Sequence, residues 1–229
     1  MSKKNLSQAE YAYQHLRSEI LECQLMPGTR LTESGTLERL SLGKTPVREA
    51  LQRLVNDNLM VVIPRHGYEV APISLRDVEE VFGLRTIIEP QAVVMAIGKL
   101  EKKTLKHLHL LARTGYDPQN PKSIQAFQQA NTEFHSIIAK ASGNRRLAGI
   151  VESCLAESRR LIQFGMLIQP RSEEATHEHE DLLHALEQKD QQAAMEISVR
   201  QIQASKRMVL QSLLSSKGVQ EAPIIPPTP

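Results

Sequence analysis

The feature that most constrains this chain is the stretch of residues 44–54, which reads Lys-Thr-Pro-Val-Arg-Glu-Ala-Leu-Gln-Arg-Leu. Its apolar residues recur at helical spacing, while Thr45, Arg48 and Gln52 fall on the other side of the same helix. Pro46 suits the first helical turn, because an N–H at that position would have no partner within the helix. The pattern therefore predicts a helix that begins near Lys44, packs on one side and displays polar side chains on the other.

The flanking residues indicate what this helix is for. Residues 32–40 predict a second short helix, and the turn Ser41-Leu42-Gly43 joins it to the first. Two helices joined by a tight turn that contains Gly form a helix-turn-helix. Residues 60–63 and 68–70 predict two strands around a turn at 64–67, because β-branched runs bounded by Pro and Gly are hairpin signals. The sequence therefore predicts a winged helix-turn-helix that places one helix in a DNA groove.

Composition limits the kind of nucleic acid that the chain is expected to bind and the compartment in which it is expected to lie. The net charge is only +2, so DNA affinity must come from a local patch and from two copies acting together. Trp is absent and aromatic residues are few, which disfavours single-strand or RNA binding by stacking. Cys23 and Cys154 stand alone and are expected to be buried thiols in a reducing compartment. With no membrane-length apolar run and no signal peptide, we expect a soluble, cytoplasmic protein.

The rest of the chain has helical periodicity without strand alternation. We expect helices at 7–23, 75–98, 101–113, 122–141, 145–167, 172–188 and 191–215, and Ser74 with Asp77 predicts a capping box at the start of the second of these. The expected fold is mainly α, with a winged helix-turn-helix and linker at 1–73 and an all-helical domain at 74–215. Residues 216–229 are rich in Pro and are expected to be a disordered tail.

Two groups of motifs carry a resemblance to a known family. The first group is Pro27-Gly28-x-Arg30-Leu31, Thr45-Pro46-Val47-Arg48-Glu49-Ala50-Leu51 and Arg65-x-Gly67-x-x-Val70. It resembles the N-terminal domain of GntR-family bacterial transcription regulators, although Asn58 and Gly43 stand where the family usually has Gly and Ser. The second group is Leu84-Arg85-x-x-Ile88-Glu89, Phe134-His135, Ser142-Gly143-Asn144 and Glu178-His179. It resembles the FCD subgroup, whose helical domain binds a small effector and mediates dimerisation.

The resemblance implies a two-fold dimer with each recognition helix in a major groove and each wing tip at the minor groove. The residues expected at the DNA are Lys44, Thr45, Arg48, Arg65, His66 and Gly67. An Arg fork suits guanine O6 and N7, so Arg48 is the expected base reader, and Arg65 is expected to enter the minor groove. Gly67 is expected to allow a close backbone approach. Arg53 either joins this set or pairs with Asp57 on the same helix.

The residues expected at the effector are Arg85, Glu89, Asn131, His135, His179 and Gln201. Asn131 and His135 are four residues apart, so both project from one helix face. The resemblance implies that relatives carry Asp and His at these two positions, and His at those of His179 and Gln201, and that these four residues hold a divalent metal.

Here two of the four are amides, which are weak ligands for ions such as Zn or Ni. Three readings stay open: a metal on His135 and His179, with Asn131 and Gln201 beside it; direct polar contacts to the effector without a metal; or hydrogen bonds within the helical bundle. The second is slightly favoured. An inward-facing Arg85 requires an anion, which is either Glu89 or a carboxylate of the effector.

The sequence contains no catalytic motif. His177 and His179 are two residues apart and point to different helix faces, and the run around them is not HExxH. The expected function is a ligand-responsive transcription regulator, a repressor that binds a pseudo-palindromic operator as a homodimer and a small carboxylate as effector. The alternatives are a small-molecule binding protein without a DNA role and a metal-dependent hydrolase.

Overall fold

The computed structural model describes residues 6–215, so the expected tail at 216–229 lies outside the described residues. The chain divides into two compact units, one ending at Ile73 and the other beginning at Ser74. Among the described residues, no helix is both long and apolar enough to cross a membrane.

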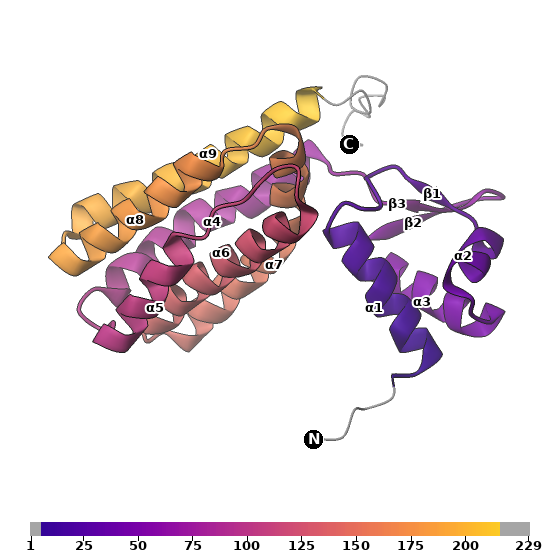
Figure 1. Cartoon of the computed structure of the whole chain (residues 1–229), viewed down its shortest axis with the longest axis horizontal. Helices are drawn as coiled ribbons and strands as arrows, with labels where there is room; N and C mark the ends of the chain where they lie inside the picture. The colour runs from indigo at the N-terminus through magenta and orange to yellow at the C-terminus, as the bar shows by residue number, and fades with distance from the viewer. Residues whose placement is uncertain (1–5, 216–229) are drawn as a thin grey trace, which may run out of the picture. The chain divides into compact units, whose positions relative to one another are not determined.

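From residue 6 onward, where the description begins, the first unit contains three helices and a small sheet (Figure 1). In chain order these are α1 Gln8–Leu21, β1 Arg30–Leu31, α2 Glu33–Leu40, α3 Lys44–Asn56, β2 Met60–Ile63 and β3 Gly67–Val70. The strand order is β1-β3-β2 and both pairings are antiparallel. The helix-turn-helix and the two-stranded wing are as predicted, whereas the sequence did not indicate β1, which is only two residues long.

The core of this unit is formed mainly by α1 and α3. Leu16 and Ile20 of α1 and Leu51 and Leu54 of α3 are fully buried together. The α3 helix begins after Gly43, which provides no side-chain cap, and is followed by Asn58 in the left-handed region at φ 56°. Asn tolerates that conformation well, so the departures from the usual family residues leave the helix intact.

The second unit is built of six helices in its described part (Figure 1). These are α4 Leu75–Ala96, α5 Lys102–Ala112, α6 Pro121–Ala141, α7 Arg145–Ile168, α8 Ser172–Gln188 and α9 Gln191–Ser215. The predicted helix ends differ from these by no more than a residue or two. The capping box at α4 is present in both directions, because the Asp77 N–H donates to Ser74 Oγ at 3.0 Å and the Ser74 N–H donates to the Asp77 carboxylate at 3.3 Å.

Helix α4 lies at the centre of this unit and contacts α6, α7 and α9. Val93 of α4, Phe134 of α6 and Leu182 of α8 belong to one buried apolar cluster. Cys23 and Cys154 are both buried, as expected. The helices around α4 thus form a closed bundle, and their polar inward-facing side chains define the second site below.

Candidate nucleic-acid interface and buried pocket

A hollow on the surface of the first unit gathers residues from α2, α3 and the wing. It is lined by Thr32, Glu33, Ser34, Leu37, Lys44, Arg48, Arg65, His66 and Gly67. These include every residue predicted to contact DNA except Thr45, which is exposed in the first turn of α3. The fold therefore brings the predicted helix residues and the predicted wing residues, which extend from Lys44 to Gly67 in the sequence, to one surface.

Arg48 is held by a carboxylate that the sequence reasoning missed. Its Nε and Nη2 atoms both donate to Glu33 in the first turn of α2, at 3.2 Å, and Lys44 Nζ lies 3.9 Å from the same carboxylate. Within the described residues, no protein group accepts a hydrogen bond from Arg48 Nη1. The guanidinium is thus fixed along one edge and available along the other. The available signal was a Glu in the first turn of the helix that precedes a basic helix N-terminus.

Arg53 does not pair with Asp57, so that alternative was wrong. Its Nη1 atom lies 2.7 Å from Glu10 of α1, and its guanidinium stacks 3.8 Å above the ring centroid of Tyr13. Asp57 instead accepts a hydrogen bond from the Tyr13 hydroxyl at 2.5 Å, and this bond raises the pKa of Tyr13. Arg53 therefore ties α3 to α1.

The wing turn has backbone conformations that explain its sequence. Arg65 and Gly67 have positive φ angles of 67° and 97°. A Cβ atom at position 67 would lie 2.6 Å from the carbonyl oxygen of Leu31. The close approach that Gly67 permits here is therefore to the backbone of β1 in the same chain.

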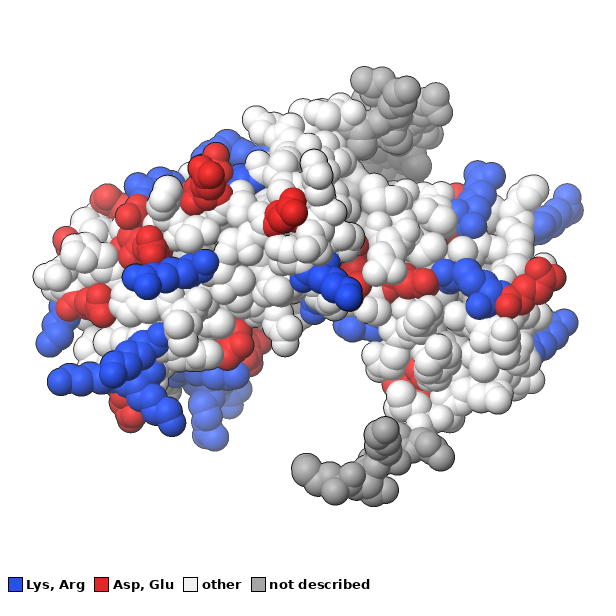
Figure 2. Space-filling model, viewed as in Figure 1, with Lys and Arg blue, Asp and Glu red and all other residues white. Residues whose placement is uncertain are grey.

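The surface charges of both signs are mixed, as Figure 2 shows for its visible face. In the first unit, Arg30 pairs with Glu69, Arg39 pairs with Glu19, and Arg48 pairs with Glu33. Much of the positive charge of this unit is therefore neutralised locally.

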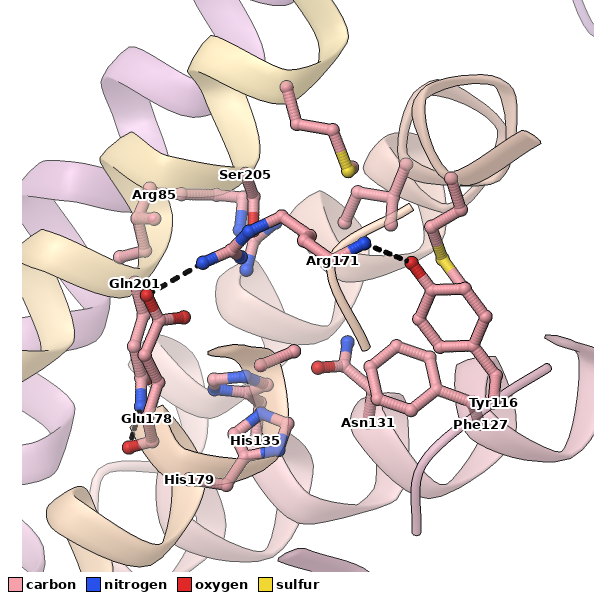
Figure 3. Close-up of a pocket in the computed structure, with 15 residues that line it drawn as sticks. Arg85, Tyr116, Phe127, Asn131, His135, Arg171, Glu178, His179, Gln201 and Ser205 are labelled. Atoms are coloured by element: carbon pink, nitrogen blue, oxygen red, sulfur yellow. Dashed lines mark hydrogen bonds and ion pairs between the residues drawn. The ribbon is translucent and has the colours of Figure 1, made fainter. Parts of the chain in front are cut away.

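The second unit encloses a cavity of about 40 Å³ between its helices (Figure 3). Its polar lining residues are Arg85, Tyr116, Asn131, Arg171, Glu178, Gln201, Ser205 and two histidines, His135 and His179. All the residues predicted for an effector site line it except Glu89, which lies behind Arg85. The apolar lining includes Phe127, Ile162, Met166 and Met208.

Arg85 has its anion within the protein. Its Nε donates to Glu89 Oε1 at 2.5 Å, and its Nη1 donates to Ser158 Oγ at 3.1 Å. The side chains of Arg85 and Glu89 are only 3% and 4% exposed. A buried pair with several hydrogen bonds is costly to break, because either charge alone would be left desolvated. Arg85 and Glu89 thus form a fixed wall of the cavity.

The two histidines lie side by side, with ring centroids 5.4 Å apart. Burial, and then the charge of Arg85, lowers the pKa of His135 to about 3. Burial lowers the pKa of His179 well below its usual value, and His135 and Arg171 add to this effect. Both rings are therefore neutral at pH 7. His177 is exposed on the other side of α8, as its spacing predicted.

Two buried polar atoms at the cavity, His179 Nδ1 and Gln201 Oε1, have no hydrogen-bond partner among residues 6–215. The amide nitrogen of Gln201 donates to the main-chain oxygen of Glu178. Because a carbonyl oxygen only accepts, this bond fixes the amide so that its oxygen remains unpaired. An unpaired buried acceptor costs about 1–3 kcal/mol, so this oxygen is a candidate contact for a hydrogen-bond donor in the cavity.

Arg171 is the pocket residue of most chemical consequence that the sequence reasoning missed. Its Nη2 atom lies 2.7 Å from Glu178 Oε1, and its main-chain N–H donates to the Tyr116 hydroxyl at 2.8 Å. Figure 3 shows its side chain reaching into the pocket from the segment before α8. Because Arg171 lies between two helices and directly after a proline, helical periodicity gave no indication of where its side chain points.

The donors present do not fit a resident divalent metal. Among the described residues, no group of three or more His, Cys, Asp and Glu side chains is placed to hold one. The carboxylates nearest the histidines, Glu89 and Glu178, are each bound to an arginine. Two neutral imidazoles and two amides remain, and amide oxygens are weak ligands for ions of the zinc type.

Comparison with known proteins gives consistent matches to both units. The sequence profile described as "Bacterial regulatory proteins, gntR family" matches residues 8–70, and that of the FCD domain matches residues 80–204. The chain is 25% identical to the uncharacterized HTH-type transcriptional regulator YdhC of Bacillus subtilis (strain 168), over 80% of this chain and 82% of that protein. It is also 25% identical to the HTH-type transcriptional repressor RspR of Escherichia coli (strain K12), over 87% and 89% of the two chains. The solved structure of E. coli McbR/YncC superposes with a TM-score of 0.65 at 25% identity, covering 90% of this chain and 98% of that one.

Proposed function

Because the chain belongs to the GntR family of bacterial regulatory proteins and carries an FCD domain, it is a DNA-binding transcriptional regulator and not an enzyme, and we propose how its two units act. The protein is a repressor that works in the bacterial cytoplasm. It binds a pseudo-palindromic operator as a homodimer, and a small carboxylate effector in the helical unit sets its affinity for DNA.

The observation that supports the DNA contact is the convergence of predicted residues on one hollow. Arg48 presents its unpaired Nη1 edge there, beside Lys44 of the same helix and Arg65 of the wing. Arg48 reads a guanine in the major groove, while Arg65 enters the minor groove. The residues at the α3 N-terminus hold phosphates, because that end of a helix carries free N–H groups and a positive dipole. Two copies related by a two-fold axis then read half-sites about 34 Å apart.

The effector is held by direct polar contacts and no resident metal is needed. A guanidinium has five N–H donors, and Glu178 binds only some of those of Arg171. Arg171 therefore also donates hydrogen bonds to a carboxylate of the effector. Gln201 Oε1 is an unpaired acceptor, so the effector also carries a donor such as a hydroxyl or amino group. Asn131, His135 and His179 supply further neutral donors and acceptors.

Control of DNA binding follows from differential affinity. A ligand shifts an equilibrium only if it binds one arrangement of the protein better than another. The linker at residues 71–73 joins the DNA-binding unit to the helical unit, so it is where the effector changes the placement of the winged domains.

The test is operator binding by Arg48→Ala, with the operator selected from a random duplex library by the wild-type protein. Loss of a bidentate Arg–guanine contact should weaken binding by about 1–3 kcal/mol and relax one base position. Arg113→Ala is the matched control, because Arg113 is an exposed arginine directly after α5 in the other unit. If folded Arg48→Ala bound the selected duplex as tightly as wild type, the DNA-reading role of α3 would be refuted. If no duplex were selected at all, the small-molecule binding protein without a DNA role would be favoured.

A further inference from the structure

The charged groups around the cavity of the helical unit are already paired with one another. Arg85 Nε lies 2.5 Å from Glu89 Oε1, and Arg171 Nη2 lies 2.7 Å from Glu178 Oε1. The two imidazoles at the cavity are neutral and add no charge. Among residues 6–215, the side chains that line the cavity, together with Glu89 behind Arg85, therefore sum to zero charge.

A ligand carboxylate at Arg171 disturbs this balance. The site would then hold two carboxylates for one guanidinium, that of the ligand and that of Glu178, whose side chain is only 16% exposed. This holds whether Glu178 keeps its contact with Arg171 or turns away from it. A carboxylate that is largely removed from water is costly without a cation, so a ligand with a single negative charge leaves one carboxylate in excess. A ligand that brings its own cation restores the balance.

The unpaired acceptors of the cavity call for more than one hydrogen-bond donor. Within residues 6–215, neither Gln201 Oε1 nor His179 Nδ1 has a partner. The Nδ1 atom is an acceptor in the tautomer that carries the ring proton on Nε2. Together with the Glu178 carboxylate, these atoms give the cavity three acceptors (Figure 3). A hydroxyl donates one hydrogen bond and a primary ammonium donates three, so the ammonium matches this set.

We propose that the effector is a small α-amino acid, bound as its zwitterion. Its carboxylate accepts hydrogen bonds from the N–H groups of Arg171 that Glu178 leaves available, and its ammonium donates to Glu178 and Gln201. One carbon separates the two charged groups of an α-amino acid, which suits a cation and an anion of the protein that are themselves in contact. This inference rests on the carboxylate effector of the proposed function, and it selects an amino group over a hydroxyl.

The size of the cavity limits the side chain of the amino acid. Its volume of about 40 Å³ provides space for about three water molecules. Phe127, Ile162 and Met166 form an apolar part of the lining, against which a short side chain can pack. The cavity therefore favours amino acids on the scale of glycine, alanine and serine over those with long side chains.

The test compares matched ligands by isothermal titration calorimetry of the full-length chain at pH 7. The pairs are glycine with glycolate, L-alanine with L-lactate, and L-serine with L-glycerate, and within each pair only the ammonium and the hydroxyl differ. At least one amino acid should have a dissociation constant at least about tenfold lower than that of its hydroxy acid, because the ammonium makes charge-assisted hydrogen bonds and leaves no buried acceptor unpaired. This comparison uses the wild-type chain, so it does not depend on the folding of any variant.

Glu178→Gln tests the source of this preference. The substitution removes the negative charge that the ammonium balances, so the preference for the amino acid over its hydroxy acid should fall by about tenfold. The ratio of the two dissociation constants is the readout, because a general loss of affinity cancels in it. Glu173→Gln is the matched control, since it removes the same charge from an exposed position in the first turn of α8 and should leave the ratio unchanged. Circular dichroism verifies that both variants are folded.

The possible outcomes separate this inference from the proposed function. If the hydroxy acids bound as tightly as the amino acids, or more tightly, the inference would be overturned while a carboxylate effector would stand. If folded Glu178→Gln kept the wild-type ratio, Glu178 would not be the group that recognises the ammonium, and the charge argument would fail. If neither series bound, the carboxylate effector of the proposed function would fail together with this inference.

Discussion

Acid should destabilise the helical unit through the two buried neutral histidines. In the folded protein the pKa of His135 is lowered to about 3, whereas in the unfolded chain it returns to about 6.5. Between these values the unfolded state binds one more proton than the folded state, so stability is greatest above pH 6.5 and falls as the pH falls. The slope is about 1.4 kcal/mol per pH unit for each such group, which amounts to about 2 kcal/mol between pH 8 and pH 5 for His135. His179 acts in the same direction.

The measurement is amide hydrogen exchange of peptides from α6 and α8 at several pH values, after correction for the intrinsic exchange rate. Exchange by unfolding of the helical unit reports the free energy of that unit alone, which matters because the chain has two units. His135→Asn should be less stable than wild type at pH 8. Between pH 8 and pH 5, the variant should lose about 2 kcal/mol less stability than wild type loses over the same range.

The control is His177→Asn, because His177 is exposed on α8 and is hydrated in both states. Its pH dependence should match that of wild type. If the stability curves of His135→Asn and wild type ran parallel between pH 8 and pH 5, the histidine would not be buried as a neutral group. The account of the pocket as a set of uncharged donors and acceptors would then fail.

Four further outcomes are expected. Glu33→Gln removes the charge that holds Arg48, so binding to a random duplex should strengthen while the preference for the operator falls. Gel-shift titrations measure the affinity for each duplex, and an unchanged ratio of the two affinities would contradict this prediction. Because much positive charge in the first unit is already paired, the salt dependence of operator binding should be shallow, with about −0.9 in the log–log slope for each contacted phosphate. Gly67→Ala should destabilise the winged unit by more than about 2 kcal/mol. Gly28→Ala should destabilise it by only about 1 kcal/mol, because Gly28 has a φ of 81° but an added Cβ would have no atom within 4 Å. Equal decreases in the melting temperature of the two variants would contradict this prediction. Elemental analysis of the purified protein should find no stoichiometric zinc or nickel, and a metal that is lost in His135→Ala would show that the altered set still coordinates one.

Local signals were sufficient to predict most of the helices. Ser74 with Asp77 marks the start of α4, and Asn120 caps α6 by accepting from the N–H groups of Lys122 and Ser123. Such caps act over three residues, so a single sequence records them. The strand β1 was missed because two residues show no periodicity, and it exists only because β3 pairs with it.

Long-range partners were not predictable in the same way. Arg53 binds Glu10, which is 43 residues away, and no local pattern distinguishes this partner from Asp57 on the same helix. The Arg85–Glu89 pair was one of two predicted alternatives because its spacing is four residues. The placement of Arg171 in the pocket depends on how α7 and α8 meet, which periodicity does not encode.

The two arginines of the pocket therefore have different roles in the proposed mechanism. Arg85 and Glu89 are almost wholly buried, so separating them would leave two desolvated charges, and an incoming carboxylate cannot displace Glu89 at reasonable cost. Arg171 and Glu178 retain 18% and 16% exposure, so Glu178 can turn toward water when a ligand carboxylate takes its place. Arg171 precedes the first residue of α8, and Glu178 and His179 lie within that helix. Exchange of one carboxylate for another at Arg171 thus acts directly on the start of α8, which makes this segment the part of the bundle that responds first to the effector.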